Sequence, residues 1–165
     1  MNNTEEFQIV IGEICLVFST TDWYTTTLMF FLFDKSKTNK YTKVGEQTTL
    51  GQKFKMLKEA KPEEVTNQEI LATLHGFVDD AIRLADKRNR YIHDLWMFNE
   101  QLLQEGRFRR MKMRKLGENT HFVLHWTDHN VQEVRDFRDQ LIALQQKLGP
   151  LVNAASGKTL IKQES

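Results

Sequence analysis

The chain has 165 residues, a mass of 19.5 kDa and a net charge of +1, because 23 basic side chains nearly balance 22 acidic ones. This balance excludes a globally basic nucleic-acid binder, so any such role depends on local charge. A single cysteine, Cys15, excludes an internal disulfide, a zinc-finger framework and a Cys-x-x-Cys redox pair. There is no basic leader and no uncharged apolar run of about 18 residues, which predicts a cytoplasmic protein with no membrane partner.

A helical pattern opens the chain between Thr4 and Phe33. Apolar residues recur at helical spacing, with Thr4 as the expected N-cap and two glutamates behind it. The threonines between Ser19 and Thr27 are weak helix formers, so the segment is either one long helix or two helices that break near residue 20. Residues 29–33 are nearly all apolar, which predicts burial from more than one side, and a partner chain is one way to achieve it.

The middle of the chain contains two further helical segments. A polar, lysine-rich loop over 34–48 leads to a short predicted helix over 49–61. Its inward-facing residues are Leu50, Phe54 and Leu57. Beyond Pro62, Thr66 with Glu69 forms a capping box, and a regular apolar stripe predicts one helix of about seven turns that includes Leu95.

The last third changes from a strand pattern back to a helical one. Alternating residues from 107 and a β-branched, aromatic stretch up to 126 flank turn residues at 117–119, which predicts a β-hairpin. Asp128 is the expected cap of a final helix that stops at Gly149 and Pro150. We therefore predict an all-α helical bundle with a small β-hairpin insert before the last helix, a single domain over 1–153 and a flexible tail over 154–165.

Arg88 occupies a position of the long helix where the stripe predicts an apolar side chain. A charge on a buried stripe is costly unless it is paired or used. His93 follows five residues later, about 140° around an ideal helix axis, so one helix does not place the two side by side. An ion pair between Arg88 and an acid of a neighbouring helix is the structural explanation. The functional explanation is a second copy of the helix, or a frayed last turn, that brings arginine and histidine around one phosphate.

The stretch from Arg88 to His93, with Asn89 directly after the arginine, resembles the R-x4–6-H motif of the HEPN superfamily. The setting is similar too, because the motif lies late in a long bundle helix and is followed by Asp94-Leu95-Trp96. The first helix, the Thr-Leu-Gly-x-Lys-x-x-x-Leu segment at 49–57, the basic hairpin and the leucine-rich last helix resemble bacterial HEPN-like proteins of this size. The resemblance covers about residues 4–150.

The resemblance implies a symmetric homodimer in which the arginine and histidine of both chains meet in one cleft. Many members are endoribonucleases that need no metal or cofactor, and they serve as toxins of toxin–antitoxin pairs or in phage defence. By position, His93 would transfer protons at the ribose 2′-hydroxyl or the leaving oxygen, and Arg88 would stabilise charge on the phosphate. Asn89 would orient His93 or the phosphate. Other members are inactive, so the alternative is a non-catalytic module that binds RNA, a nucleotide or a protein partner such as an antitoxin.

A basic run follows the motif and is a candidate RNA-binding segment. Its members are Arg107, Arg109, Arg110, Lys112 and Arg114, with Lys115 beyond them. On a strand, the last three of the five would share one face while Met111 and Met113 occupy the other. An RNA backbone would be attracted to such a face in a salt-dependent way. The alternative is a solvated edge strand whose charges prevent aggregation.

Three histidines near the end of the hairpin raise the question of a metal site. His121, His125 and His129 are spaced four apart, which on a helix would place them on one face. The stretch reads as a strand running into a cap, and no cysteine or His-Glu-x-x-His signature accompanies it. Surface or packing histidines are the favoured interpretation, and we predict no metal site.

Overall fold

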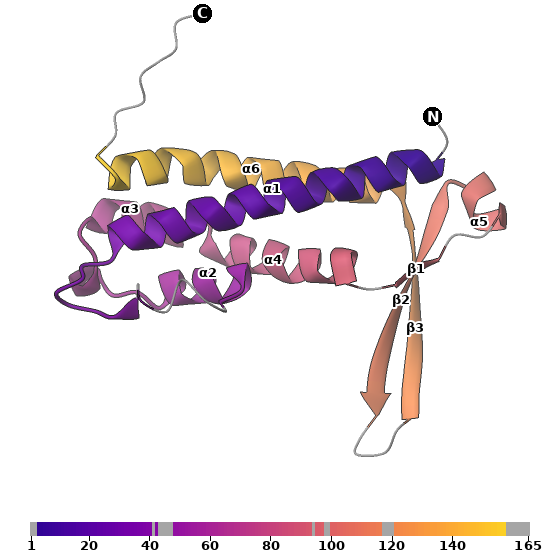
Figure 1. Ribbon diagram of the computed structural model, residues 1–165, viewed down its shortest axis with the longest axis horizontal. Coiled ribbons are helices and arrows are strands. Elements are labelled where there is room, and N and C mark those ends of the chain that lie inside the picture. The colour runs from indigo at the N-terminus through magenta and orange to yellow at the C-terminus, as the bar shows by residue number, and fades with distance from the viewer. Residues whose placement is uncertain are drawn as a thin grey trace, which may run out of the picture. The chain divides into compact units, whose positions relative to one another are not determined.

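The computed structural model describes residues 3–40, 42, 48–93, 95–97, 100–116 and 121–157. The fold is predominantly helical with a small antiparallel hairpin before the last helix, as the sequence predicts (Figure 1). In chain order the elements are α1 (Asn3–Leu32), α2 (Leu50–Lys58), a 3-10 turn (Pro62–Glu64), α3 (Gln68–His75), α4 (Val78–His93), β1 (Leu95–Met97), α5 (Glu100–Gln104), β2 (Arg107–Leu116), β3 (His121–Asn130) and α6 (Val131–Ala155).

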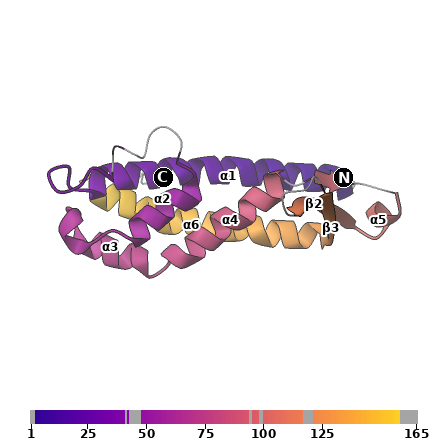
Figure 2. The same cartoon turned by 90° about the horizontal axis from the view of Figure 1, so that it is seen from below.

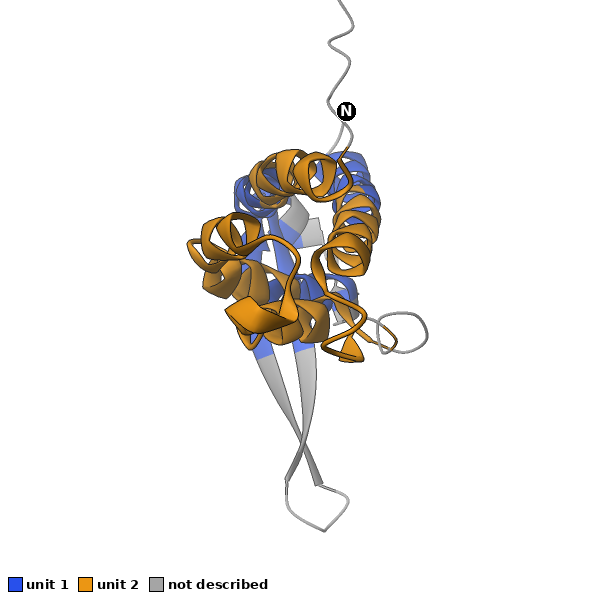
Figure 3. Ribbon diagram, turned by 90° about the vertical axis from the view of Figure 1, so that its left-hand side faces the viewer, with its two compact units in different colours: residues 1–16, 87–140 blue, residues 17–86, 141–165 orange. Residues whose placement is uncertain are grey.

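The chain divides into two compact units (Figure 3). Unit 1 comprises residues 1–16 and 87–140, and unit 2 comprises residues 17–86 and 141–165. The helices α1, α4 and α6 each contribute residues to both units. The sequence predicts a tail from residue 154; α6 runs on to Ala155, and residues 158–165 lie outside the described part of the chain.

Helix α1 is a single helix, which settles the alternative of a break near residue 20. Its threonine hydroxyls donate to carbonyls one turn earlier: Thr21 to Val17 at 2.7 Å, and Thr25 to Thr21 at 2.8 Å. Each hydroxyl therefore finds its acceptor within α1, and the threonine side chains do not draw the backbone into a non-helical conformation. Thr4 lies within the helix, which begins at Asn3, so the prediction that Thr4 is the N-cap is wrong.

Helix α2 forms where it is predicted. Thr49 caps it by accepting a hydrogen bond from the backbone N–H of Gln52, and the Gln52 side chain accepts from the Thr49 backbone N–H. The predicted inward-facing residues Leu50, Phe54 and Leu57 are all buried. Within unit 2, α2 packs against α3 (Figure 2).

The long helix predicted from Thr66 onward is wrong, because α3 and α4 are separate helices. The break falls at Gly76 and Phe77. Their backbone N–H groups donate to the carbonyls three residues earlier, those of Thr73 and Leu74, at 3.2 and 3.0 Å. Glycine costs a helix interior about 1 kcal/mol, and the acids Asp79 and Asp80 at the start of α4 favour a new N-terminus there.

Both ends of this predicted helix also differ from expectation. Asn67 is the N-cap of α3, because its Oδ1 accepts from the N–H groups of Glu69 and Ile70 at 3.0 and 3.1 Å. Thr66 instead donates to carbonyls at the end of α1. At the other end, Leu95 belongs to β1, a strand that the sequence pattern did not predict.

The predicted hairpin is confirmed as the antiparallel pair β2 and β3, in register from Arg107 opposite Asn130 to Leu116 opposite His121. The turn residues predicted at 117–119 lie outside the described residues. Strand β1 pairs antiparallel with the other edge of β2, so β2 is the central strand of the three. Gly106 precedes β2 with φ +66°, a left-handed conformation that glycine adopts at no steric cost.

Helix α6 begins after Asn130, whose Oδ1 accepts from the backbone N–H of Glu133 at 2.9 Å and caps the helix. The prediction that Asp128 is the cap is wrong, because β3 extends to Asn130 and the Asp128 carboxylate instead pairs with Arg109 at 2.7 Å. Because β3 continues directly into α6 without a loop, the N-cap is Asn130, two residues after the predicted Asp128.

The predicted stop of α6 at Gly149 and Pro150 is also wrong, since the helix continues through both. Leu148 and Val152, on either side of the proline, are buried. Their burial offsets the hydrogen bond that the Pro150 nitrogen cannot donate. The apolar stripe predicted for α6 is confirmed as buried: Val131, Val134, Phe137, Leu141, Leu144 and Leu148.

Each unit has its own apolar core. The buried side chains of unit 1 include Phe7, Tyr91, Leu102, Phe108, Val134 and Phe137. Those of unit 2 include Leu28, Leu32, Phe33, Phe54, Leu57, Leu74, Leu141 and Leu148. Among the described helices, none combines the length and the apolar character needed to cross a lipid bilayer.

Candidate functional site

The three residues of the predicted catalytic motif lie in the last turns of α4. Arg88 is half-buried and Asn89 is exposed, and Nη1 of Arg88 lies 3.4 Å from Oδ1 of Asn89. His93 is the last residue of the helix, and its side chain lies outside the described part of the chain. Because Arg88 and His93 are five residues apart on one helix, their Cα–Cβ directions differ by about 140°. The structure therefore brings Arg88 and Asn89 together, while the approach of Arg88 to His93 stays a prediction.

A buried aromatic cluster holds this part of α4 in place. The ring of Tyr91 stacks on Phe137 of α6, with centroids 4.9 Å apart and planes 21° apart. The indole N–H of Trp96 donates to the Tyr91 carbonyl at 2.7 Å, and Phe7 of α1 lies edge-on to Trp96 at 4.8 Å. Elements α1, α4, β1 and α6 of unit 1 thus converge on the turn that carries the motif. Packing of this kind holds functional side chains more rigidly than a loop does.

Two cations lie over the rings of this cluster. The ammonium of Lys87 is 4.9 Å from the Phe137 centroid and 5.7 Å from the Tyr91 centroid, and the Arg110 guanidinium is 5.8 Å from Tyr91. Burial raises the pKa of the Tyr91 phenol, the charge of Glu133 raises it further, and Arg110 opposes both. The phenol is therefore neutral near pH 7 and cannot serve as a base there. The charges around the ring are mixed, because Lys87 and Arg110 approach it from different elements while the Glu133 carboxylate lies nearby.

His129 completes the cluster and was not among the predicted site residues. Its Nδ1 lies 2.8 Å from Oε2 of Glu133, one turn into α6. The imidazole ring packs against Tyr91 and Trp96 with centroids 5.6 Å away from each. Its Nε2 is buried and makes no hydrogen bond within the described residues. The i, i+4 spacing of His129 and Glu133 is visible in the sequence, but it becomes informative only once Asn130 is known to be the cap.

Arg107 and Arg109 of the basic run both form ion pairs with Asp128. Arg109 donates through Nε and Nη2 to the two Asp128 oxygens at 2.7 and 3.1 Å, and Arg107 reaches the same carboxylate at 2.8 Å. Arg107 also contacts Glu105 at 3.1 Å. The bond from Arg109 lowers the pKa of Asp128, with further lowering by the charge of Arg107, and the carboxylate in turn raises the pKa of Arg109. Both arginines stay protonated, and the carboxylates of Asp128 and Glu105 balance their positive charges.

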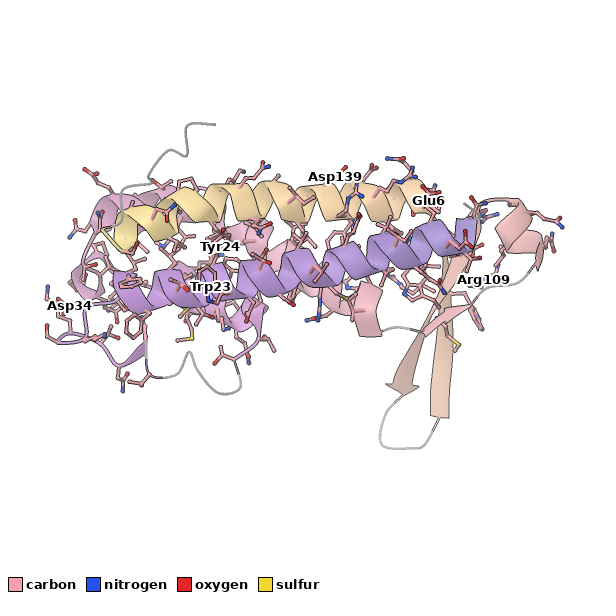
Figure 4. All side chains as sticks on the ribbon, turned by 45° about the horizontal axis from the view of Figure 1, so that its top comes forward. Glu6, Trp23, Tyr24, Asp34, Arg109 and Asp139 are labelled. Carbon is pink, nitrogen blue, oxygen red and sulfur yellow. The ribbon has the colours of Figure 1, made fainter. Side chains whose placement is uncertain are left out.

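The five basic residues do not form one face of β2. Alternate residues of a strand point to opposite sides, so Arg107 and Arg109 lie on one side and Arg110 on the other. Figure 4 labels Arg109 on β2. Lys112 and Arg114 are placed by register alone, opposite His125 and Val123, and their side chains lie outside the described residues. Among the three predicted RNA-binding arginines whose side chains the structure describes, Arg110 lies beside Tyr91 of α4, whereas Arg107 and Arg109 pair with Asp128.

The predicted absence of a metal site can be compared with the described residues only. Within them, no three His, Cys, Asp or Glu side chains converge as metal ligands would. The side chains of His121 and His125 lie outside the described part, and His129 packs among aromatic rings as stated above.

Comparison of the chain with protein-family models, curated proteins and solved structures finds no match.

Proposed function

We propose that the protein is a metal-independent endoribonuclease of the HEPN type, a cytoplasmic toxin or defence component that acts as a homodimer. The observation that carries the proposal is the position of the motif. Arg88, Asn89 and His93 occupy the last turns of α4, where Lys87 and Arg110 also gather around Tyr91. Cations from two elements beside the motif favour the approach of a phosphodiester.

The chemistry assigned to the motif follows from its side-chain types. Imidazole titrates near neutrality, so His93 takes the proton of the ribose 2′-hydroxyl or returns one to the leaving oxygen. The Arg88 guanidinium stabilises the additional charge on the phosphate oxygens in the transition state. Asn89, whose Oδ1 lies close to Arg88, orients the guanidinium or the bound phosphate. Neither a metal ion nor another cofactor takes part in these steps.

The homodimer gives a reason why Arg88 and His93 need not meet on one helix. Their separation of about 140° around α4 prevents both from facing one phosphate within a single ideal helix. A second α4 related by a two-fold axis supplies the missing partner, as symmetric interfaces do. An antitoxin would then block the shared cleft.

The test is cleavage of a labelled mixed-sequence RNA in EDTA by wild type, Arg88→Ala and His93→Ala, purified identically. Arg83→Ala and His75→Ala are matched controls, because Arg83 lies exposed on α4 and pairs with Asp80, and His75 lies exposed at the end of α3. We expect cleavage by wild type and both controls, and a loss of 100-fold or more in the motif variants, since general acid–base and electrostatic groups contribute about that much. Equal cleavage by all five proteins would assign the activity to a contaminant or another site.

The second candidate is a non-catalytic module that binds RNA, a nucleotide or a protein partner. The pairing of Arg107 and Arg109 with Asp128 and Glu105 predicts that RNA binding through β2 is weak, because two carboxylates balance the charge of two of the five cations. RNA binding that survives both motif substitutions, without cleavage by any of the proteins, would favour this module over the nuclease.

A further inference from the structure

The antiparallel strands β2 and β3 present two different faces. In such a pair, residues directly opposite each other point to the same side of the sheet. One side carries Phe108, which is fully buried, and His129, which belongs to the aromatic cluster around Tyr91. The other side carries a set of residues that we call the outer face: Arg107, Arg109, Met111, Trp126 and Asp128.

Trp126 is the aromatic residue of the outer face, and it is 46% exposed. Since a tryptophan side chain buries at most about 250 Å², this exposure leaves on the order of 100 Å² of the ring open to solvent. A stable protein–protein interface takes about 800 Å² from each partner, far more than this ring offers. A single flat ring system is therefore a better match to Trp126 than a protein surface is.

The guanidinium of Arg109 lies beside the Trp126 ring, 5.9 Å from its centroid, near the outer limit of a cation–π contact. Asp128 fixes the direction of this guanidinium, because Nε and Nη2 both donate to the carboxylate at 2.7 and 3.1 Å. Among the described residues, none accepts a hydrogen bond from Nη1 of Arg109. The N–H groups of Nη1 are therefore left for an acceptor from outside the chain.

An exposed indole with a fixed guanidinium beside it is suited to one unit of single-stranded nucleic acid. A base stacks on the ring, and the guanidinium donates to a phosphate of the backbone. Net charge contributes little, because the carboxylates of Asp128 and Glu105 balance the two arginines of the outer face. A double helix keeps its bases stacked on one another, so it presents no free base to the indole.

We propose that Trp126 is a stacking platform for an unpaired base of single-stranded RNA, and that Nη1 of Arg109 donates to the phosphate next to that base. The choice of RNA as the ligand rests on the proposed function. The platform lies on the side of the sheet opposite to the aromatic cluster, so it is a second contact for the strand and not part of the reacting centre. Because stacking tolerates any base, the platform selects an unpaired strand rather than a sequence.

The test is the affinity of the full-length protein for a labelled, single-stranded 2′-O-methyl RNA of about ten nucleotides, measured by fluorescence anisotropy in EDTA. Methylation of the 2′-oxygen prevents cleavage, so binding is measured by itself. Trp126→Ala should weaken binding on the order of 10-fold, and Trp126→Phe should retain most of the affinity because a phenyl ring also stacks. Trp23→Ala is the matched control, since Trp23 is 61% exposed on α1 (Figure 4), and it should bind as wild type does.

Salt and strandedness separate stacking from a general attraction to a polyanion. The ratio of the affinities of wild type and Trp126→Ala should be the same at about 50 and 200 mM salt, because stacking releases no counterions. A duplex of the same sequence should bind with an affinity that Trp126→Ala leaves unchanged. Arg109→Lys keeps a positive charge beside Asp128 but lacks the guanidinium fork, so it should weaken binding of the single strand severalfold.

An unchanged affinity of Trp126→Ala, or an equal loss in Trp23→Ala, would overturn the proposal. A wild type that does not bind the strand would overturn it too, and would leave Trp126 to a protein contact. RNA cleavage in EDTA by a protein whose binding does not depend on Trp126 would reject the platform and keep the nuclease. Binding that depends on Trp126, in a protein that cleaves no RNA, would keep the platform and reject the nuclease.

Discussion

The pair of Lys53 and Asp22 allows a stability prediction in which the two partners behave differently. The Lys53 ammonium lies 2.8 and 2.9 Å from the Asp22 carboxylate oxygens and 2.9 Å from Oγ1 of Thr26. The Lys53 side chain is only 6% exposed, whereas that of Asp22 is 38% exposed. The pair therefore has one end in the core of unit 2 and the other in water.

Removal of the carboxylate should cost far more than removal of the ammonium. In Asp22→Ala the buried Lys53 charge keeps only the Thr26 hydroxyl, and breaking a fully buried pair costs about 3–5 kcal/mol. Because Asp22 is partly solvated, we expect about 2–3 kcal/mol, or a fall in Tm of roughly 5–10 °C for a chain of this size. In Lys53→Met the long apolar stem is retained and Asp22 regains water, so the change should stay within about 1 kcal/mol.

Urea unfolding followed by far-ultraviolet circular dichroism measures both variants. Asp22→Ala/Lys53→Met should be about as stable as Lys53→Met alone, because the stranded charge is gone. Asp139→Ala, which removes an exposed helical acid, is the control and should change stability by no more than about 0.5 kcal/mol. If Lys53→Met were as destabilising as Asp22→Ala, the reasoning from desolvation would be refuted.

Three further predictions concern unit 1 and α6. Arg109 lowers the pKa of Asp128, so the Asp128 carboxylate stabilises the fold above its unfolded pKa of about 4, and this stabilisation is lost as the pH falls through the folded pKa. The difference in unfolding free energy between wild type and Asp128→Asn should therefore shrink below about pH 4. A difference that does not depend on pH would contradict the pairing. Pro150→Ala should raise stability by about 1–3 kcal/mol in thermal unfolding, because Pro150 is exposed inside α6, and a loss would show that the proline fits the helix there. Phe137→Ala should cost about 3–5 kcal/mol, since the buried ring stacks on Tyr91, and a change below 1 kcal/mol would exclude a packed cluster at the motif.

The elements with the clearest periodicity could be predicted from the sequence. The stripe of α6, the short helix α2 and the alternating strands of the hairpin follow directly from the spacing of their apolar residues. The exact ends of the helices were harder to predict, because several neighbouring side chains could each have formed the terminal hydrogen bond. The break at Gly76, the cap at Asn130 and the passage of α6 through Pro150 each depend on which side chains the tertiary fold buries or pairs.

The candidate site was predictable in part. The sequence alone places Arg88, Asn89 and His93 on one helix, because their spacing and the helical stripe are local properties. It does not place Lys87, Arg110 and His129 around Tyr91, since those neighbours come from elements far apart along the chain. Strand alternation alone predicts that Arg107 and Arg109 face one side of β2 and Arg110 the other. The ion pair of Arg109 with Asp128 depends in addition on the register of β2 with β3, which the sequence does not give.

The most direct measurement of the central claim compares an RNA oligonucleotide with its fully 2′-deoxy counterpart, both incubated with wild-type protein in EDTA. A centre that uses the ribose 2′-hydroxyl without a metal ion predicts cleavage of the RNA and an intact deoxy strand. The RNA fragments should carry a 2′,3′-cyclic phosphate, because the 2′-oxygen displaces the leaving oxygen at the same phosphorus. Cleavage of both strands, or cleavage of the RNA only after a divalent metal ion is added, would contradict the account.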